Sequence, residues 1–176
     1  SVEFPQFAAD DGPGGSDSHY LNEGQYQGVP YADAADYQGG TRVAPAPINL
    51  AYSWNKELAY ENGEIILGES TLVLNLPIMI GPGMNIHRNP LCGRNFEYYS
   101  EDPMMTGSIA AAVCKGVASR PGNFATIKHF AANNQEFQRN KASSNLTERT
   151  LREIYLRPFK RAIRDGGARS VMTSYN

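Results

Sequence analysis

The chain has 176 residues, of which 41% are hydrophobic and 19% are charged, and its formal net charge is −2. This composition is that of a globular domain with a buried core, and it excludes a chain that is disordered throughout. The small net charge indicates no nucleic-acid partner and no attraction to an anionic membrane, and the longest apolar run, residues 72–80, is too short to span a bilayer.

Five apolar segments are predicted to form strands: residues 4–9, 47–52, 72–80, 124–130 and 170–175. Helical patterns separate most of them, and this alternation of strand and helix predicts a parallel sheet. The first helix is expected over about residues 55–68, with Asn55 as its N-cap. Its apolar side is predicted to hold Leu58, Ile65 and Ile66.

Two further helices carry start signals. Asp102 before Pro103 predicts a helix start, because aspartate caps the free N–H groups and proline is favoured at the first helical position. Thr147 is predicted to cap the last helix, and Pro158 to break it locally. The predicted inward residues are Met105, Ile109, Ala112, Val113 and Val117 of the first of these helices, and Leu151, Ile154, Tyr155, Phe159 and Ile163 of the second. The basic residues of the last helix are expected on a solvated face.

Residues 12 to about 46 show no sustained periodicity and are rich in Gly and Tyr. A loop this long inside a compact domain is typical of a functional lid or an insertion. Its tyrosines, Tyr20, Tyr26, Tyr31 and Tyr37, are candidates for stacking on a sugar and equally for anchoring the loop.

Polar residues gather where the predicted strands end, at one rim if the strands form a parallel barrel. They are Asp11, Asn85, His87, Arg94, Glu97, Lys128, His129, Tyr175 and Asn176. A pocket that combines carboxylate, guanidinium, ammonium and imidazole suits a neutral ligand with many hydroxyl groups. Each residue also has a structural explanation: Asp11 can cap a turn, His87 can shape its loop, and Arg94 can simply pair with Glu97.

Taken together, residues 81–88, 93–103, 125–136, 148–156 and 172–176 resemble glycoside hydrolase family 3 in order and spacing. The resemblance covers about residues 44–176, and the residues of these motifs are most similar to those of the family's β-glucosidase branch. It implies an α/β fold, a (β/α)8 TIM-like barrel of which about the first five βα units are present. Residues 1–176 are then part of the catalytic domain of a larger protein, with the long loop at about 12–46.

The resemblance implies a retaining exo-glycosidase that removes a terminal β-linked sugar, commonly glucose, from short glycosides. The substrate-binding residues that it implies are Asp11, Arg94, Lys128, His129, Met172 and Tyr175, with Glu97 and Arg139 as supports behind them. In this reading Asp11 accepts hydrogen bonds from the sugar, whereas Arg94, Lys128 and His129 donate them. No metal and no organic cofactor is expected, because two carboxyl groups suffice for the reaction.

The chain departs from the family in three ways. The family arginine after Asp-Gly-Pro falls near Ser16 or Asp17, where this chain has none, and Arg42 is the candidate replacement. The nucleophilic aspartate is expected beyond Asn176, and the acid/base group in another domain or loop. We therefore expect this chain alone to be inactive and poorly folded, with the remainder of its own polypeptide as the partner that completes the barrel.

Several alternatives remain open. A β-xylosidase or a β-N-acetylglucosaminidase keeps the mechanism and changes the sugar, a non-catalytic sugar-binding protein keeps only the pocket, and a phosphate-binding barrel is disfavoured. The chain starts without an initiator Met or a signal-peptide pattern, so it is expected to be a piece of something longer. The compartment stays unassigned, with a slight preference for the cytoplasm because Cys92 and Cys114 fit no disulfide scaffold.

Overall fold

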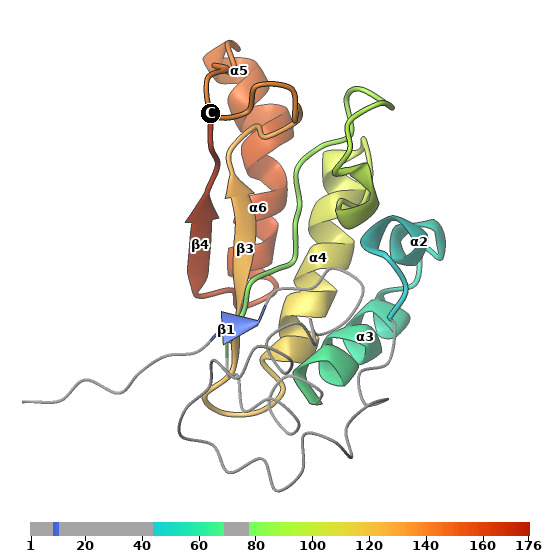
Figure 1. Ribbon diagram of the computed structural model, residues 1–176. Coiled ribbons are helices and arrows are strands. Elements are labelled where there is room, and N and C mark those ends of the chain that lie inside the picture. Colours follow the sequence, from blue (N-terminus) through green and yellow to red (C-terminus); the bar gives the residue numbers. More distant parts are fainter. Residues whose placement is uncertain (1–8, 11–43, 69–77) are drawn as a thin grey trace, which may run out of the picture.

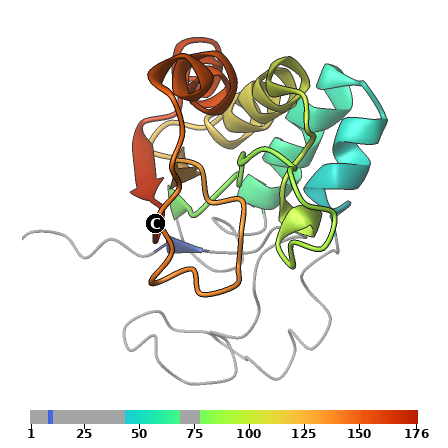
Figure 2. The same ribbon diagram turned by 90° about the horizontal axis from the view of Figure 1, so that it is seen from above.

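The computed structural model describes residues 9–10, 44–68 and 78–176. Within these residues, four parallel strands form one sheet in the order β1 (Ala9–Asp10), β2 (Ile78–Met79), β3 (Phe124–Phe130) and β4 (Ser170–Thr173). Seen from above, the helices lie along one side of this sheet (Figure 2). The spatial order of the strands equals their order in the chain, so each strand–helix unit is added beside the previous one.

The strand predicted at residues 47–52 is wrong, because this segment forms helix α2 (Pro47–Tyr52). Pro47 stands in the first turn, where its fixed φ and missing N–H group cost nothing, and Leu50 and Ala51 are buried. A short apolar run cannot be assigned to strand or helix by periodicity alone. The strand predicted at residues 4–9 is described only at its end, where β1 begins, and the strand predicted at 72–80 is described only from residue 78, where it contains β2. Nearly all of the 12–46 loop lies outside the described residues.

The predicted first helix is confirmed as α3 (Lys56–Gly68), and Asn55 Oδ1 accepts from the backbone N–H of Leu58 at 3.0 Å. Its buried face is different from the predicted one: Leu58 and Ile65 are exposed, and only Ile66 of the three is buried. The face that turns inward combines the small residues Ala59 and Gly63 with Asn62, Ile66 and Leu67. Small side chains allow the helix to approach its neighbour closely, which hydrophobicity alone does not reveal.

Helix α4 (Pro103–Val117) is confirmed, with Asp102 Oδ1 accepting from Met104 N at 2.6 Å. It buries Ile109, Val113 and Val117 as predicted. It packs against α3 through two glycines: a Cβ on Gly63 would lie 3.0 Å from the Cα of Gly116, and one on Gly116 would overlap the carbonyl oxygen of Tyr60. The two backbones are therefore in direct contact.

The last helical segment is divided into α5 (Glu148–Thr150), a π-helical turn η3 (Leu151–Tyr155) and α6 (Leu156–Arg164). Thr147 Oγ1 caps it by accepting from Thr150 N at 3.2 Å, as predicted. The π-turn is the predicted break. It lies in the turn before Pro158, which has no N–H to donate to that turn. Figure 1 shows α6 beside β3 and β4, where the Phe159 ring packs edge-on against Phe130 at 5.2 Å between centroids.

The basic face of this segment is solvated, as predicted: Arg149 pairs with Glu153, and Arg152 with Glu148, on the exposed side. Ile163, predicted to point inward, is exposed. Within residues 44–68 and 78–176, none of the helices combines the length and the apolar character needed to cross a membrane.

We expect Gly116→Ala to lower the free energy of unfolding by about 1–2 kcal/mol. Alanine improves helix propensity by about 1 kcal/mol, but overpacking against a backbone carbonyl costs up to about 3 kcal/mol. Gly93→Ala is the control, because a Cβ at Gly93 meets nothing within 4 Å. Urea unfolding of the protein that contains this chain measures both, and equal stability of Gly116→Ala and the parent would contradict the close helix contact.

Candidate functional site

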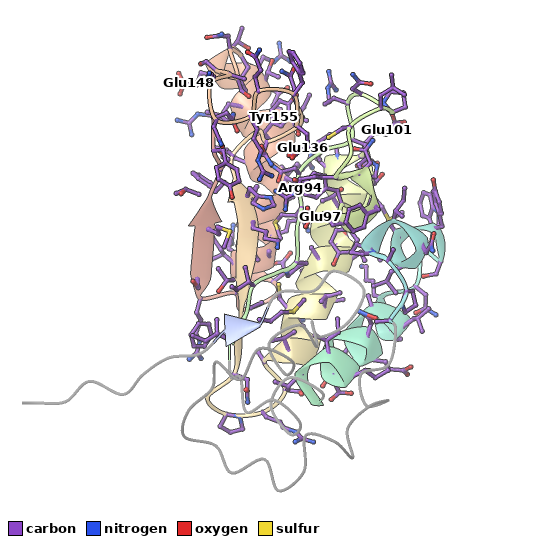
Figure 3. The ribbon with its side chains drawn as sticks, in the orientation of Figure 1. Arg94, Glu97, Glu101, Glu136, Glu148 and Tyr155 are labelled. Carbon is purple, nitrogen blue, oxygen red and sulfur yellow. The ribbon has the colours of Figure 1, made fainter. Side chains whose placement is uncertain are left out.

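The site lies where β3 and the segment that follows β2 run side by side. After β2, Gly83 forms a parallel bridge with Lys128, and Met84 N donates to Lys128 O at 2.7 Å. A Cβ on Gly83 would lie 3.0 Å from the Tyr98 ring, so only glycine allows this approach without displacement. The pairing places the loop that leads to the 3₁₀ helix η2 (Asn95–Glu97) over the end of β3. Figure 3 shows Arg94, Glu97 and Glu136 gathered there.

Glu97 holds two cations from different segments. Its Oε1 accepts from Arg94 Nε in the loop, and its Oε2 lies 3.7 Å from Lys128 Nζ on β3. Glu97 and Lys128 are each only 3% exposed. Burial alone lowers the pKa of Arg94, but the hydrogen bond to Glu97 and the charges around it outweigh this, so the pKa of Arg94 is raised. Arg94 therefore stays charged.

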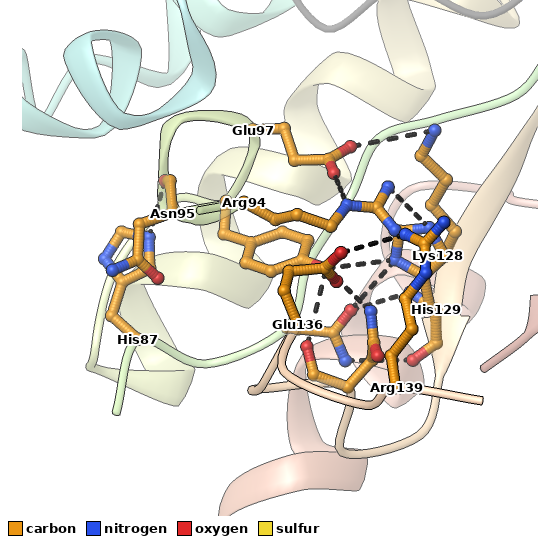
Figure 4. Close-up of polar contacts among 11 residues, drawn as sticks. His87, Arg94, Asn95, Glu97, Lys128, His129, Glu136 and Arg139 are labelled. Carbon is orange, nitrogen blue, oxygen red and sulfur yellow. Dashed lines mark hydrogen bonds and ion pairs between the residues drawn. The ribbon is translucent and has the colours of Figure 1, made fainter. Parts of the chain in front are cut away.

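His129 follows Lys128 and is equally buried. Its Nε2 lies 2.9 Å from Arg94 Nη2, and Figure 4 shows Arg94 between Glu97 and His129. Burial, together with the positive charges of Arg94, Lys128 and Arg139, lowers the pKa of His129 to about 3. The ring is therefore neutral near pH 7.

A second group lies on the loop after β3. Arg139 Nη1 donates to Glu136 Oε2 at 2.9 Å, and Arg139 Cζ lies 4.4 Å from the centre of the Tyr175 ring. Glu136 also contributes to the charge around Arg94, so the two groups adjoin. Arg139 thus fixes Tyr175, which follows β4 and is otherwise exposed.

The structure brings together Arg94, Glu97, Lys128 and His129 in direct contact, and places Arg139 with Tyr175 beside them. Met172 is half-buried on β4. Asp11 and Arg42 lie outside the described residues, as do Tyr20, Tyr26, Tyr31 and Tyr37. His87 has a structural contact, since its Nε2 lies 2.9 Å from the carbonyl oxygen of Asn95.

The sequence assigned no specific role to three residues that surround His129. Asn85, Tyr98 and Asn133 are buried and hydrogen-bonded to His129 or to one another. The sequence marked Asn85 only as a polar residue at a strand end. Tyr98 and Asn133 lie within longer motifs, and nothing in the sequence singled them out. Their burial depends on the pairing between the β2 exit and β3, which no local pattern reveals.

Among the residues that the structure describes, no three side chains of His, Cys, Asp or Glu come together to hold a metal ion. Cys92 and Cys114 are both free, and burial raises the pKa of the Cys114 thiol to about 12. The described site is thus built from charged and amide side chains.

Residues 18–176 match the family model described as the glycosyl hydrolase family 3 N terminal domain. The chain is 48% identical over 132 residues to thermostable β-glucosidase B of Acetivibrio thermocellus, which covers 75% of this chain and 17% of that protein. It is 38% identical to an exo-α-(1→6)-L-arabinopyranosidase of Bifidobacterium longum over all of this chain and 22% of that protein.

Among solved structures, β-glucosidase 3B from Thermotoga neapolitana in complex with glucose is similar with a TM-score of 0.83 and 44% identity. The match covers 98% of this chain and 22% of that one. The chain thus spans about a fifth of the length of the relatives that it matches.

Because the pKa of His129 is about 3 in the folded state and near its ordinary 6.5 when unfolded, the unfolded state binds more protons between these values. Stability from this group is therefore complete above about pH 6.5 and falls as the pH drops toward 3. We expect His129→Gln to flatten the dependence of unfolding free energy on pH in this window, by at most about 1.4 kcal/mol per pH unit. Urea unfolding across the window checks this, and parallel curves for parent and variant would contradict it.

Glu97→Gln should destabilise the protein by about 3–5 kcal/mol, because it removes the carboxylate that pairs with the buried Lys128 and the partly buried Arg94. The matched control is Glu153→Gln, whose partner Arg149 is 83% exposed at its side chain. That exposed pair is worth at most about 1 kcal/mol. Thermal or urea unfolding compares the two variants, and a similar small loss in both would show that Glu97 does not hold Arg94 and Lys128.

Proposed function

The chain belongs to glycosyl hydrolase family 3, and on that premise we propose that its protein hydrolyses terminal, non-reducing β-D-glucosyl residues of short β-glucosides. The observation that carries the proposal is the cluster of buried Lys128 and Glu97 with partly buried Arg94 at the carboxyl end of the parallel strands. Active sites of parallel α/β barrels are built at that end. The relatives named above include β-glucosidases, one of them in complex with glucose.

The chemistry of the cluster fits a sugar better than an ionic ligand. Lys128 and Arg94 supply charged donors that strengthen hydrogen bonds to hydroxyl oxygens. Glu97 offsets part of their charge, so the pocket does not demand an anion. In the proposed complex Lys128, Arg94 and Asp11 bind sugar hydroxyls, with Met172 and Tyr175 lining the pocket. Both ring nitrogens of His129 lie against protein groups, so we give His129 the role of holding Arg94 in place of the predicted contact with the sugar.

Glu97 and Arg139 support these residues and do not contact the sugar in the proposed complex. Glu97 orients Lys128 and Arg94, and Arg139 orients Tyr175 through its contact with the ring. We assign both a supporting role because their charged groups are already engaged with protein partners.

We propose a (β/α)8 barrel completed by the remainder of the polypeptide, with double displacement through a covalent glycosyl-enzyme. Retention needs two carboxyl groups about 5–5.5 Å apart. Both carboxyl groups in the described part of the site, those of Glu97 and Glu136, are paired with cations. We therefore place the nucleophile and the acid/base group in other parts of the protein.

A second candidate keeps the mechanism and changes the sugar. The relative from Bifidobacterium longum matches the whole chain and is named an arabinopyranosidase. The same cluster can bind an arabinopyranosyl ring, since glucosides and arabinopyranosides both present hydroxyl groups on a pyranose ring. Rates on nitrophenyl β-glucoside, α-L-arabinopyranoside, β-xyloside and N-acetyl-β-glucosaminide separate these choices.

In the complete protein, we expect Lys128→Ala and Asp11→Ala each to lower kcat/KM for an aryl β-glucoside by roughly 30- to 150-fold. The loss corresponds to about 2–3 kcal/mol of transition-state stabilisation, because charged contacts to hydroxyls strengthen in the transition state. Lys160→Ala is the control, since Lys160 is exposed on α6 away from the site. A parent protein that binds glucose but cleaves no aryl glycoside would favour a non-catalytic sugar-binding protein.

A further inference from the structure

The protonation of His129 follows from its neighbour Arg94. A guanidinium carries only N–H donors, so the His129 Nε2 atom that lies 2.9 Å from Arg94 Nη2 must accept. The neutral ring then carries its proton on Nδ1.

Asn85 leads to the same tautomer independently. Its Nδ2 donates to the His129 carbonyl oxygen at 2.9 Å, and its Oδ1 accepts from the His129 backbone N–H at 2.9 Å. These two backbone groups have fixed roles, so they determine which way the amide of Asn85 points. Its Oδ1 lies 3.2 Å from His129 Nδ1, and an oxygen acceptor there requires a proton on Nδ1.

Tyr98 supports the same side of the ring. Its hydroxyl lies 3.2 Å from His129 Nδ1 and accepts from Asn133 Nδ2 at 3.2 Å. Burial raises the pKa of Tyr98, so its hydroxyl stays a neutral phenol. Asn85, Tyr98 and Asn133 are each at most 2% exposed, which excludes bulk water from this face of the ring.

We propose that Asn85, supported by Tyr98 and Asn133, is a positioning residue that holds His129 in the Nδ1-protonated tautomer and so fixes Arg94 through the bare Nε2. The backbone of β3 orients the Asn85 amide, the Asn85 amide orients the His129 ring, and the His129 ring orients the Arg94 guanidinium. Glu97 holds the other side of Arg94. As far as activity is concerned, this inference rests on the proposed function.

The groups that face His129 decide how it responds to pH. Among the described residues, the cations are Arg94, Lys128 and Arg139, and the titratable hydroxyl is that of Tyr98. The nearby carboxylates, Glu97 and Glu136, are each paired with one or two of these cations. No carboxylate among these residues contacts Nδ1, so nothing there favours the imidazolium.

Asn85→Asp tests the proposal in the complete protein. A carboxylate beside Nδ1 favours the doubly protonated ring, whose Nε2–H then opposes Arg94 instead of accepting from it. We expect the acidic limb of the kcat/KM profile on an aryl β-glucoside to move up by at least about one pH unit, and kcat/KM at neutral pH to fall about 100-fold, as small misplacements do.

Nitrogen NMR of ¹⁵N-histidine-labelled protein reads the tautomer without any activity. The His129 signals are identified by their loss in His129→Gln. We expect a proton on Nδ1 and none on Nε2 in the parent, and protons on both in mildly acidic Asn85→Asp. Should the parent cleave no glycoside, the proposed function fails while this measurement still decides the tautomer.

Thr106→Val is the control for loss of a buried hydrogen bond, because Thr106 is fully buried and its hydroxyl donates to Ser100 O at 3.3 Å, in a contact separate from His129. It should lower stability and leave the pH profile unchanged. If Asn85→Asp does not fold, Tyr98→Phe keeps the test, with a smaller fall in kcat/KM and a weaker preference for the Nδ1 proton. A parent His129 protonated on Nε2, or an acidic limb that stays in place in folded Asn85→Asp, overturns the proposal.

Discussion

The described site depends on one buried carboxylate that holds two cations. Glu97 reaches Arg94 within its own loop and Lys128 on β3, so a single side chain joins the β2 exit to the sheet. Burial of any one of these charges alone is costly, and removal of Glu97 takes a favourable partner from both cations. The three charges together carry a net charge of about +1, which strengthens donation to neutral hydroxyl oxygens without selecting an anion.

This ion cluster exists because the backbone continues its parallel pairing beyond β2. Gly83 lies against Lys128, and the next residues run beside the end of β3. Asn85 therefore stands opposite His129 and can bond to both of its backbone groups. One backbone arrangement thus determines where the cations lie and which nitrogen of His129 carries the proton.

The sequence predicted much of this architecture, and its failures have physical causes. β3, α4 and the Thr147 cap were predicted because a short segment rich in Phe, Ile and Thr, an Asp-Pro start and a hydroxyl before a helical pattern are local signals. The error at Pro47–Tyr52 arose because six residues are too few for periodicity to separate strand from helix. The buried face of α3 was misjudged because the close contact with α4 requires a small residue, Gly63, at its centre, and hydrophobicity does not predict that position.

The residues of the candidate site likewise fall into those that the sequence predicted and those that it did not. Arg94, Lys128 and His129 were predicted from their positions at strand ends and from the family resemblance, and they do meet. The partners of His129 on its Nδ1 side were not predicted, since Asn85 and Tyr98 contact it only through pairing between distant segments. Ion pairs and amide contacts across 30 or more residues are properties of the fold and not of a motif.

The most direct test of the account is a crystal structure of the complete protein with glucose bound. We predict that glucose hydroxyls lie within hydrogen-bonding distance of Lys128 Nζ and the Arg94 guanidinium, with Glu97 still between the two cations. Glucose bound elsewhere, or a Lys128 that contacts only protein groups in the occupied site, would contradict the role given to this cluster.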